Sequence, residues 1–232
     1  MTNQAQTPQP MSFAILRNTH EVFRKSIALM SEILDKGTLG EFRDEWASFR
    51  RCRATHLAME EGAVFSLLDE VGDGAITEAG LGQEHIEDLE NAELVEQATT
   101  ADDVARAFEV WKKFQLEHLA HEERVMGPLT MKTAPTPAGR GRVVQERLVL
   151  PAIVHGDFDW YLAFTIARLT AYGTAEQPPA VAVRVFAWGL QYASTPEQWS
   201  QWKNIVQENT TADIWLEMVD KFQIDGDGKI AD

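Results

Sequence analysis

Two nearly identical hexapeptides in this sequence carry side chains of the kind that bind metal ions. HLAMEE spans residues 56–61 and HLAHEE spans residues 118–123, and they differ only where Met59 is replaced by His121. Each hexapeptide places a histidine four residues before a glutamate. On a helix, residues four apart lie only about 40° apart around the axis, so the imidazole and the carboxylate point to the same side. Each pair could therefore offer one nitrogen and one oxygen ligand to a metal ion.

The similarity extends along two predicted helices. Apolar residues recur at steps of three and four through residues 42–67 and again through 104–129, which predicts two amphipathic helices. The two stripes align without gaps at a constant offset of 62 residues. This offset indicates two equivalent helix-loop-helix halves. The aligned pairs are Phe42 with Val104, Trp46 with Phe108, Phe49 with Trp111, Arg53 with Gln115, His56 with His118, and Glu60 with Glu122.

Two more helices are predicted, each with one histidine on its apolar stripe. The first stripe runs from Phe13 to Leu34 and contains His20, and glycines soon afterwards end that helix. The other stretch covers about residues 83–98 and contains His85 in phase with its apolar residues. No convincing strand pattern is present. We therefore predict an all-α fold built on an antiparallel four-helix bundle.

The polar residues on these four stripes form one candidate metal site. A buried carboxylate without a partner costs on the order of several kcal/mol or takes up a proton. Two carboxylates beside four imidazoles are best explained by a shared positive charge, which two metal ions would supply. A coordination count then leaves about two positions open for an exogenous ligand. Imidazole and carboxylate without thiolate suit iron, manganese or zinc. The candidate ligands are His20, His56, Glu60, His85, His118 and Glu122.

As an ordered set, these residues resemble the hemerythrin-like proteins of the HHE cation-binding type. The resemblance covers roughly residues 11–131 and rests on His20, HLAME, His85 and HLAHE, in that order. It implies a non-haem, carboxylate-bridged di-iron site with two Fe ions, joined by an oxo or hydroxo bridge. It also implies that dioxygen, peroxide or a small anion interacts with the metal site, or that the protein handles iron itself.

The sequence also departs from oxygen-carrying hemerythrin. That protein has HxxxH in its third helix, whereas Leu89 stands four residues after His85 here. Its fourth helix has HxxxxD, and Glu123 occupies that last position. We favour Glu122 as the ligand because it matches Glu60 in the repeat. The missing histidine argues against simple reversible oxygen carriage.

Three functional hypotheses remain. The leading one is a protein that binds, senses or reacts with dioxygen or peroxide. The second is an oxidase or peroxide-consuming enzyme, and the third is iron storage or trafficking. A mononuclear zinc site with three histidines is a weaker alternative because it leaves the paired glutamates unexplained.

Composition and charge exclude several other classes. The chain has 232 residues, of which 44% are hydrophobic, and its formal net charge is −15. Nucleic acids and anionic membranes favour basic surfaces, so we expect no binding to either. No apolar run is long enough to span a membrane, and the N-terminus lacks an apolar signal core. Cys52 is the single cysteine, which excludes an intrachain disulfide and a cysteine-based zinc site. We expect a cytoplasmic protein.

The chain divides into five predicted segments. A disordered lead (1–10) precedes the bundle (11–131), and a stretch rich in Pro, Gly and Thr suggests a linker (132–150). A helical extension (151–222) and a tail (223–232) follow. Within the extension, Thr195 followed by Pro196 predicts a helix start. The extension either packs on the bundle or mediates a homodimer.

Several side chains near the hexapeptides are open to more than one interpretation. His121 either ligates metal itself or hydrogen-bonds a ligand from outside. Glu61 and Glu123 point away from the stripes, and we expect them to be solvated or paired with arginine.

Two acidic stretches are weaker candidates for cation binding. In HGDFDW, His155, Asp157 and Asp159 are expected to cap a helix start rather than bind a second cation. The tail QIDGDGKIAD follows part of a calcium-loop pattern, but it lacks the first acidic ligand and the bidentate glutamate. We therefore expect no calcium site there.

Overall fold

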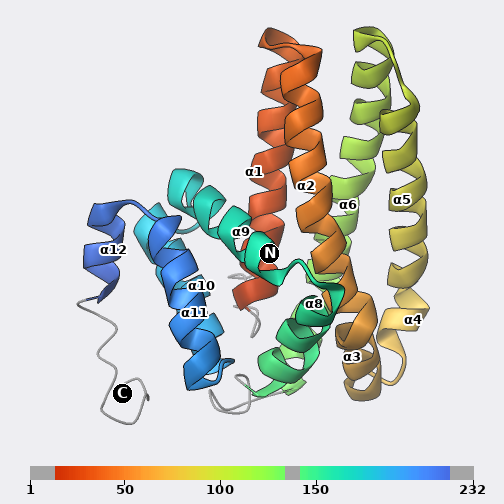
Figure 1. Cartoon of the computed structure of the whole chain (residues 1–232). Helices are drawn as coiled ribbons and strands as arrows, with labels where there is room; N and C mark the ends of the chain where they lie inside the picture. The colour runs from red at the N-terminus through yellow and green to blue at the C-terminus, as the bar shows by residue number, and fades with distance from the viewer. Residues whose placement is uncertain (1–13, 134–141, 220–232) are drawn as a thin grey trace, which may run out of the picture.

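The computed structural model describes residues 14–133 and 142–219, and these residues form helices and no strand. The all-α prediction is therefore confirmed. Four long helices stand side by side as a bundle (Figure 1), and those joined by short turns run in opposite directions. They are α1 (Ala14–Lys36), α2 (Leu39–Met59), α5 (Leu81–Gln97) and α6 (Ala101–Thr133).

Polar caps define where two of these helices begin. Thr38 accepts a hydrogen bond from the backbone N–H of Glu41 at 3.2 Å, and the Glu41 carboxylate accepts one from the Thr38 N–H at 2.7 Å. This reciprocal capping box satisfies two N–H groups that have no partner within the helix. At the start of α6, the Thr100 hydroxyl accepts from the Asp103 N–H at 3.2 Å, a cap that threonine commonly provides.

The helix that carries His56 is not continuous, contrary to the prediction. α2 passes into a π-helical turn, η1 (Glu60–Val64), and then into α3 (Phe65–Val71). A π-helical turn widens the helix locally, and such turns occur often at functional sites. Here the turn starts at a predicted metal ligand, Glu60. The glycine-rich stretch that follows contains a further short helix, α4 (Ala75–Ala79).

An aromatic core fills one end of the bundle. The apolar residues aligned by the repeat are buried on both α2 and α6, with the largest exposed fraction, 3%, at Trp46. The Trp46 and Trp111 rings meet edge to face with centroids 4.7 Å apart, and Phe49 lies 5.4 Å from Trp111. These apolar layers make the neighbouring polar layer a low-dielectric site, where charge needs a partner.

Part of the segment predicted as a linker is helical. Residues 142–144 are helical and lead into the π-helical turn η2 (Gln145–Val149), where Leu148 and Val149 are fully buried. The predicted helical extension begins with a short helix that ends where Gly156 adopts a left-handed conformation with φ of 91°. The C-terminal helices are α8 (Leu150–His155), α9 (Phe158–Tyr172), α10 (Pro179–Tyr192), α11 (Pro196–Glu208) and α12 (Ala212–Val219).

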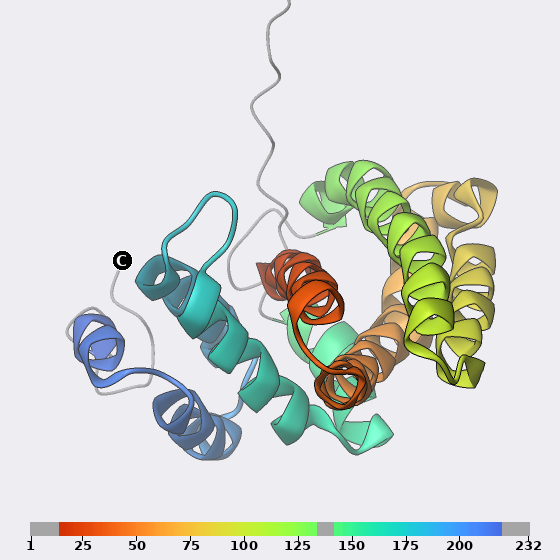
Figure 2. The same cartoon turned by 90° about the horizontal axis from the view of Figure 1, so that it is seen from above.

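The C-terminal helices pack on the α1–α2 side of the bundle. Seen from above, α1 and α2 lie between these helices and the α5–α6 pair (Figure 2). Arg168 of α9 donates to Glu45 of α2 at 2.5 Å, and Arg51 donates to Asp157 at 2.6 Å. Asp157 occupies the N-cap position of α9 but makes no side-chain cap, so the predicted capping role is wrong. The homodimer stays a prediction.

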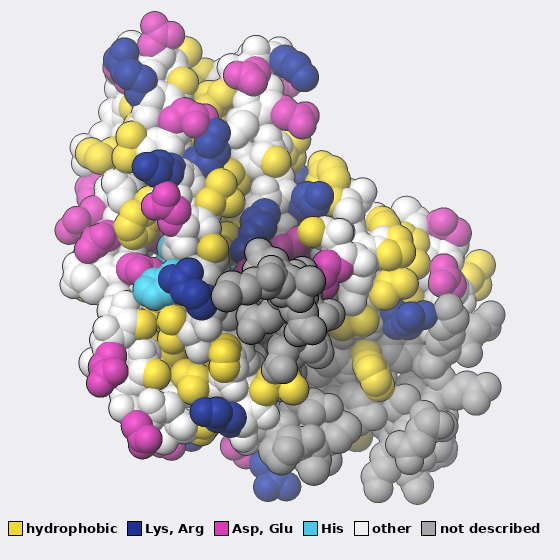
Figure 3. Space-filling model, turned by 180° about the vertical axis from the view of Figure 1, so that it is seen from behind, with side chains coloured by type: hydrophobic (Ala, Val, Ile, Leu, Met, Phe, Trp, Pro, Cys, Tyr) yellow, Lys and Arg dark blue, Asp and Glu magenta, His cyan; other side chains and the backbone are white. Residues whose placement is uncertain are grey.

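Charged and apolar side chains are mixed over the surface. On the back face, acidic and basic groups alternate over the bundle with no single-sign patch (Figure 3). No helix within the described ranges is long and apolar enough to cross a membrane. The predicted lead (1–10) and tail (223–232) lie outside the described residues.

Candidate metal centre

The six predicted ligands meet in the middle of the bundle. Each of the four long helices contributes at least one of them, and each side chain is buried. The most exposed, His118, has an exposed fraction of 5%, and Glu122 is completely buried. The periodicity of the stripes places these residues inward, and helix packing brings the stripes together. The four imidazole Nε2 atoms face the two carboxylates.

Glu60 lies between the two pairs of histidines. Its Oε1 is 3.2 Å from Nε2 of His56 and 3.8 Å from Nε2 of His20. Its Oε2 is 3.7 Å from Nε2 of His85, on the other side. The two oxygens of one carboxylate thus face different histidines.

Glu122 repeats this arrangement from the opposite helix. Its Oε2 is 3.4 Å from Nε2 of His20. Its Oε1 is 3.2 Å from Nε2 of His85 and 3.3 Å from Nε2 of His118. The result is two overlapping groups that share Glu122, consistent with a binuclear metal site. The first group is His20, His56, Glu60 and Glu122, and the second is His85, His118 and Glu122.

Several of these buried polar atoms have no hydrogen-bond partner. They are Nε2 of His20, Nε2 of His56, Oε1 of Glu60 and Oε2 of Glu122. Buried polar atoms are almost always paired, because leaving one unpaired costs roughly 1–3 kcal/mol. These four atoms belong to the first group, whose ligand atoms all lie within 4.8 Å of one another. A cation between them would satisfy all four at once, so the residues fit a metal ion.

Three carboxylates outside the six candidate ligands hydrogen-bond the Nδ1 atoms of three of the imidazoles. Nδ1 of His20 lies 3.1 Å from Glu123, and Nδ1 of His85 lies 2.9 Å from Glu61. Nδ1 of His118 lies 2.8 Å from Glu84. An ionised carboxylate only accepts, so each of these three Nδ1 atoms donates, and each Nε2 is the atom that could ligate a metal ion after losing any proton it carries.

The prediction for these glutamates holds but leaves out their contacts with histidine. Glu123 pairs with arginine, since Arg24 donates to it at 2.8 Å, and Glu61 is exposed to solvent while it also hydrogen-bonds His85. The partner role of Glu84 was not predicted. The available signal is that each of the three partners directly precedes or follows a predicted ligand in the sequence.

His121 belongs to the surroundings of the centre. Its Nδ1 lies 2.7 Å from Oε1 of Glu84, while His118 uses Oε2 of the same carboxylate. His121 is about one quarter exposed, at 24%. His121 therefore contacts Glu84, the hydrogen-bond partner of His118, rather than one of the six candidate ligands.

The carboxylates and imidazoles shift each other's pKa values. Burial opposes charge on His20, but Glu123 and the two central glutamates outweigh it and raise the pKa of His20 to about 10. Burial and Glu122 oppose charge on Glu60, but His56 and His20 outweigh them and lower the pKa of Glu60 to about 2. Despite burial, the pKa of Glu122 is also lowered, chiefly by His118 and His85. In the absence of metal, protons on the imidazoles therefore balance the negative charge of the buried carboxylates.

A second polar layer lies one helical turn from the centre. Arg53 of α2 and Asp88 of α5 form an ion pair, and both are at most 2% exposed. Gln115 of α6, with its amide oriented to donate, places its nitrogen 2.9 Å from Asp88. The repeat predicted that Arg53 and Gln115 occupy equivalent positions, but not that Asp88 joins them. This layer ties three helices together beside the histidines.

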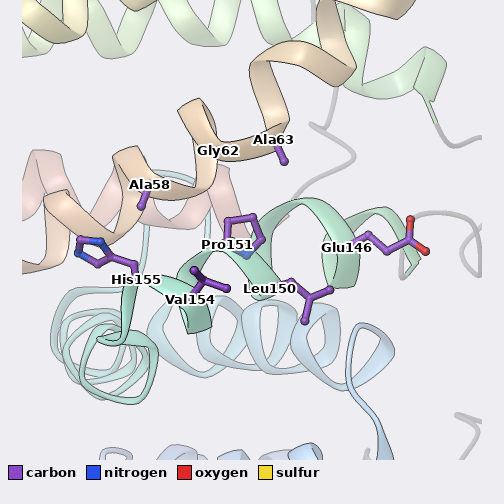
Figure 4. A pocket seen from close by; sticks show the side chains of 8 residues that line it. All are labelled: Ala58, Gly62, Ala63, Glu146, Leu150, Pro151, Val154 and His155. Atoms are coloured by element: carbon purple, nitrogen blue, oxygen red, sulfur yellow. The ribbon is translucent and has the colours of Figure 1, made fainter.

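The turn that carries Glu60 also borders a surface pocket. The pocket has a volume of about 530 Å³, and Gly62 and Pro151 meet along it (Figure 4). A Cβ on Gly62 would lie 3.3 Å from Cβ of Pro151, so α8 packs closely on η1. His155, at one end, lines this pocket. None of the six candidate ligands lines it.

Four long helices around two overlapping His/Glu groups define a helical bundle that can bind cations. Residues 11–130 match the family model described as the hemerythrin HHE cation binding domain, so the chain belongs to this family. No match was found among curated proteins or among solved structures.

Proposed function

We propose that this chain is a non-haem di-iron protein whose centre binds, senses or reacts with dioxygen or peroxide. The observation that carries the proposal is the placement of Glu60 and Glu122. Each carboxylate turns one oxygen toward His20 and the other toward His85. That arrangement suits two carboxylates that bridge two ions, with His20 and His56 on one ion and His85 and His118 on the other.

The charge around the centre supports two divalent cations. Arg24 pairs with Glu123, and Arg53 pairs with Asp88. Among the described residues, four other carboxylates at the centre have only imidazole partners: Glu60, Glu61, Glu84 and Glu122. Four negative charges balance two divalent ions when the imidazoles are neutral, which is the form that binds metal.

The donor set favours iron over softer metals. Imidazole nitrogen and carboxylate oxygen suit iron and manganese, and the one cysteine, Cys52, is buried away from the six ligands. Bound iron would supply one-electron redox chemistry. The chain's part is to hold the ligands in position, to hydrogen-bond the Nδ1 atoms of His20, His85 and His118 to carboxylates, and to exclude bulk water with the aromatic core.

The experiment is metal analysis after anaerobic iron loading. We expect two iron ions per chain, fewer than one in the His56→Ala and Glu122→Ala variants, and no change in His155→Ala, an exposed histidine outside the centre. In air, the loaded protein should show charge-transfer absorption that shifts when azide is added. Fewer than one ion per wild-type chain would refute the dinuclear site.

An oxidase or peroxide-consuming enzyme is the alternative for the same centre. It needs a pocket for a second substrate beside the ions, and the pocket at Gly62 and Pro151 does not contact the ligands. Catalytic consumption of oxygen with a co-substrate would favour the enzyme. Retention of many more than two iron ions per chain would favour storage.

A further inference from the structure

The loop between α9 and α10 contacts the bundle through one backbone N–H. Thr174 closes this loop, since its N–H donates to the carbonyl of Gln177 at 2.9 Å and its hydroxyl accepts from the N–H of Gln177 at 3.0 Å. Gly173 turns the chain with φ of 63°, where a Cβ would clash with the carbonyl oxygen of Gln177. The N–H of Ala175 then donates to Oε2 of Glu21 on α1 at 2.9 Å. The loop therefore meets α1 as a closed turn.

Charged side chains continue this contact from Glu21 to the metal centre. Arg24, one turn further along α1, donates from Nη1 to Oε1 of Glu21 at 2.7 Å and to Oε1 of Glu123 at 2.8 Å. The same Glu123 oxygen accepts from Nδ1 of His20 at 3.1 Å. Four hydrogen bonds thus connect the backbone of Ala175 with the imidazole of His20, a candidate metal ligand.

Arg24 is the residue that joins the two carboxylates. Burial opposes its charge, but Glu123 and Glu21 outweigh burial and raise the pKa of Arg24. Hydrogen bonds between charged groups are roughly twice as strong as neutral ones. Because one nitrogen, Nη1, serves both carboxylates, a shift of Glu123 changes the contact of Arg24 with Glu21.

The C-terminal helices hold the loop against α1 at two further points. Arg17 of α1 pairs with Glu176, the residue after Ala175. Asn18 donates to the carbonyl of Ala182, in the first turn of α10, at 3.4 Å. The loop and α10 lie beyond residues 11–130, which match the family model. The connection to His20 therefore belongs to the extended chain and not to the family's domain alone.

We propose that the α9–α10 loop is coupled to the metal centre through Glu21, Arg24 and Glu123. An imidazole bound to a metal ion has a fixed orientation, so metal aims the Nδ1–H of His20 at Glu123 and thereby holds Arg24 against Glu21. The loop then closes more firmly on α1. Coupling between two sites is reciprocal, so a closed loop also holds His20 in place for metal. Arg24 and Glu21 are positioning residues for His20, and the loop is where the C-terminal helices respond to the centre.

This inference rests on metal binding at the proposed site, and the test uses Zn²⁺ as a redox-inert probe. Amide hydrogen exchange of Ala175 is measured by NMR in the full chain, metal-free and loaded. In the wild-type protein, Zn²⁺ should slow this exchange about fivefold or more, which is the lower end of typical coupling between sites. Arg24→Met should abolish the slowing and weaken Zn²⁺ binding by the same factor. Arg24→Lys keeps the charge and should restore part of both effects.

A variant in the loop tests the reverse direction. Thr174→Val keeps the shape of the side chain but removes the hydroxyl that accepts from two N–H groups of the loop itself. It should weaken Zn²⁺ binding, and by no more than Arg24→Met does. The matched controls are Arg106→Met, whose partner Asp103 lies in the same helix, and Thr210→Val, between α11 and α12. Both controls should leave Zn²⁺ affinity and the exchange of Ala175 unchanged.

The possible outcomes separate this inference from the proposed function. Equal exchange of Ala175 with and without bound Zn²⁺ in the wild-type protein would overturn the coupling and leave the binuclear site intact. Undiminished slowing in Arg24→Met would also overturn it, because the loop would then respond by another route. A wild-type chain that binds fewer than one metal ion would overturn the proposed function as well. Circular dichroism of each variant confirms that it is folded.

Discussion

At the scale of single residues, protons and metal ions compete for the same buried side chains of the centre. The pKa of His20 is raised to about 10 by carboxylates that outweigh its burial, and those of His85 and His118 are raised for the same reason. In the metal-free protein, a proton on His20 therefore stabilises the fold. That stabilisation is complete below pH about 6.5, the ordinary value, and is lost as the pH rises through about 10.

Metal binding at pH 7 should therefore release protons. His20 must lose its proton before Nε2 can ligate, so we expect at least about one proton per chain, and tighter binding as the pH rises from about 7 toward 10. Calorimetric titration with Co²⁺ in two buffers of different ionisation enthalpy measures this release. His155→Gln is the control, since that histidine is exposed and outside the centre. Binding without proton release would show that His20 is neutral in the metal-free protein.

At the scale of helices, a buried ion pair sets the spacing between α2 and α5. Arg53 and Asp88 are both buried, and the pKa of Arg53 is lowered to about 10, chiefly because burial disfavours its charge. Gln115 adds a contact from α6. Because a buried pair costs desolvation energy, it serves to align the helices more than to stabilise them.

Removing one member of this pair should destabilise the protein far more than replacing both members with apolar residues. Asp88→Ala leaves Arg53 charged and unpaired, and we expect a loss of about 3–5 kcal/mol in the free energy of unfolding. The double variant Arg53→Met with Asp88→Leu should be close to the wild type in stability. Urea denaturation of the metal-free proteins measures both. A single variant that costs less than about 1 kcal/mol would mean that water reaches Arg53.

At the scale of the whole molecule, two ions would bind only the folded chain. Their six ligands come from four helices and share no site in the unfolded state. Ligand at 100 times its Kd stabilises a fold by about 2.7 kcal/mol per site. For a chain of 232 residues, this corresponds to a Tm shift of about 5–10 °C per ion.

Removal of metal should therefore lower the Tm by this amount for each ion lost. A chelator added to the loaded wild-type protein should lower the Tm by about 10–20 °C when both ions are lost, by the same scaling. The Glu122→Ala variant should already melt at the lower temperature and not respond to the chelator. An unchanged wild-type Tm would mean that the ions add little to the fold, and would contradict a buried centre.

The sequence alone was sufficient for the bundle and for the side chains that meet in it. Helical periodicity is local, so the stripes of α1, α2, α5 and α6 could be read from spacing, and the repeat supplied the pairing of His56 with His118. Burial of all six predicted ligands follows from those stripes. Their role as metal ligands remains the proposal made above.

Only the tertiary structure revealed the contacts that come from side chains off the stripes. Glu84 reaches His118 across 34 residues, and Tyr161 reaches Thr19 across 142 residues, and no local pattern predicts which residue either side chain meets. The π-helical turn at Glu60 was also not predicted, because no change in the composition of the sequence marks where it begins. Periodicity determines which face of a helix is buried. Which neighbour meets that face depends on the packing of the whole chain, and so these long-range contacts could not be predicted from the sequence.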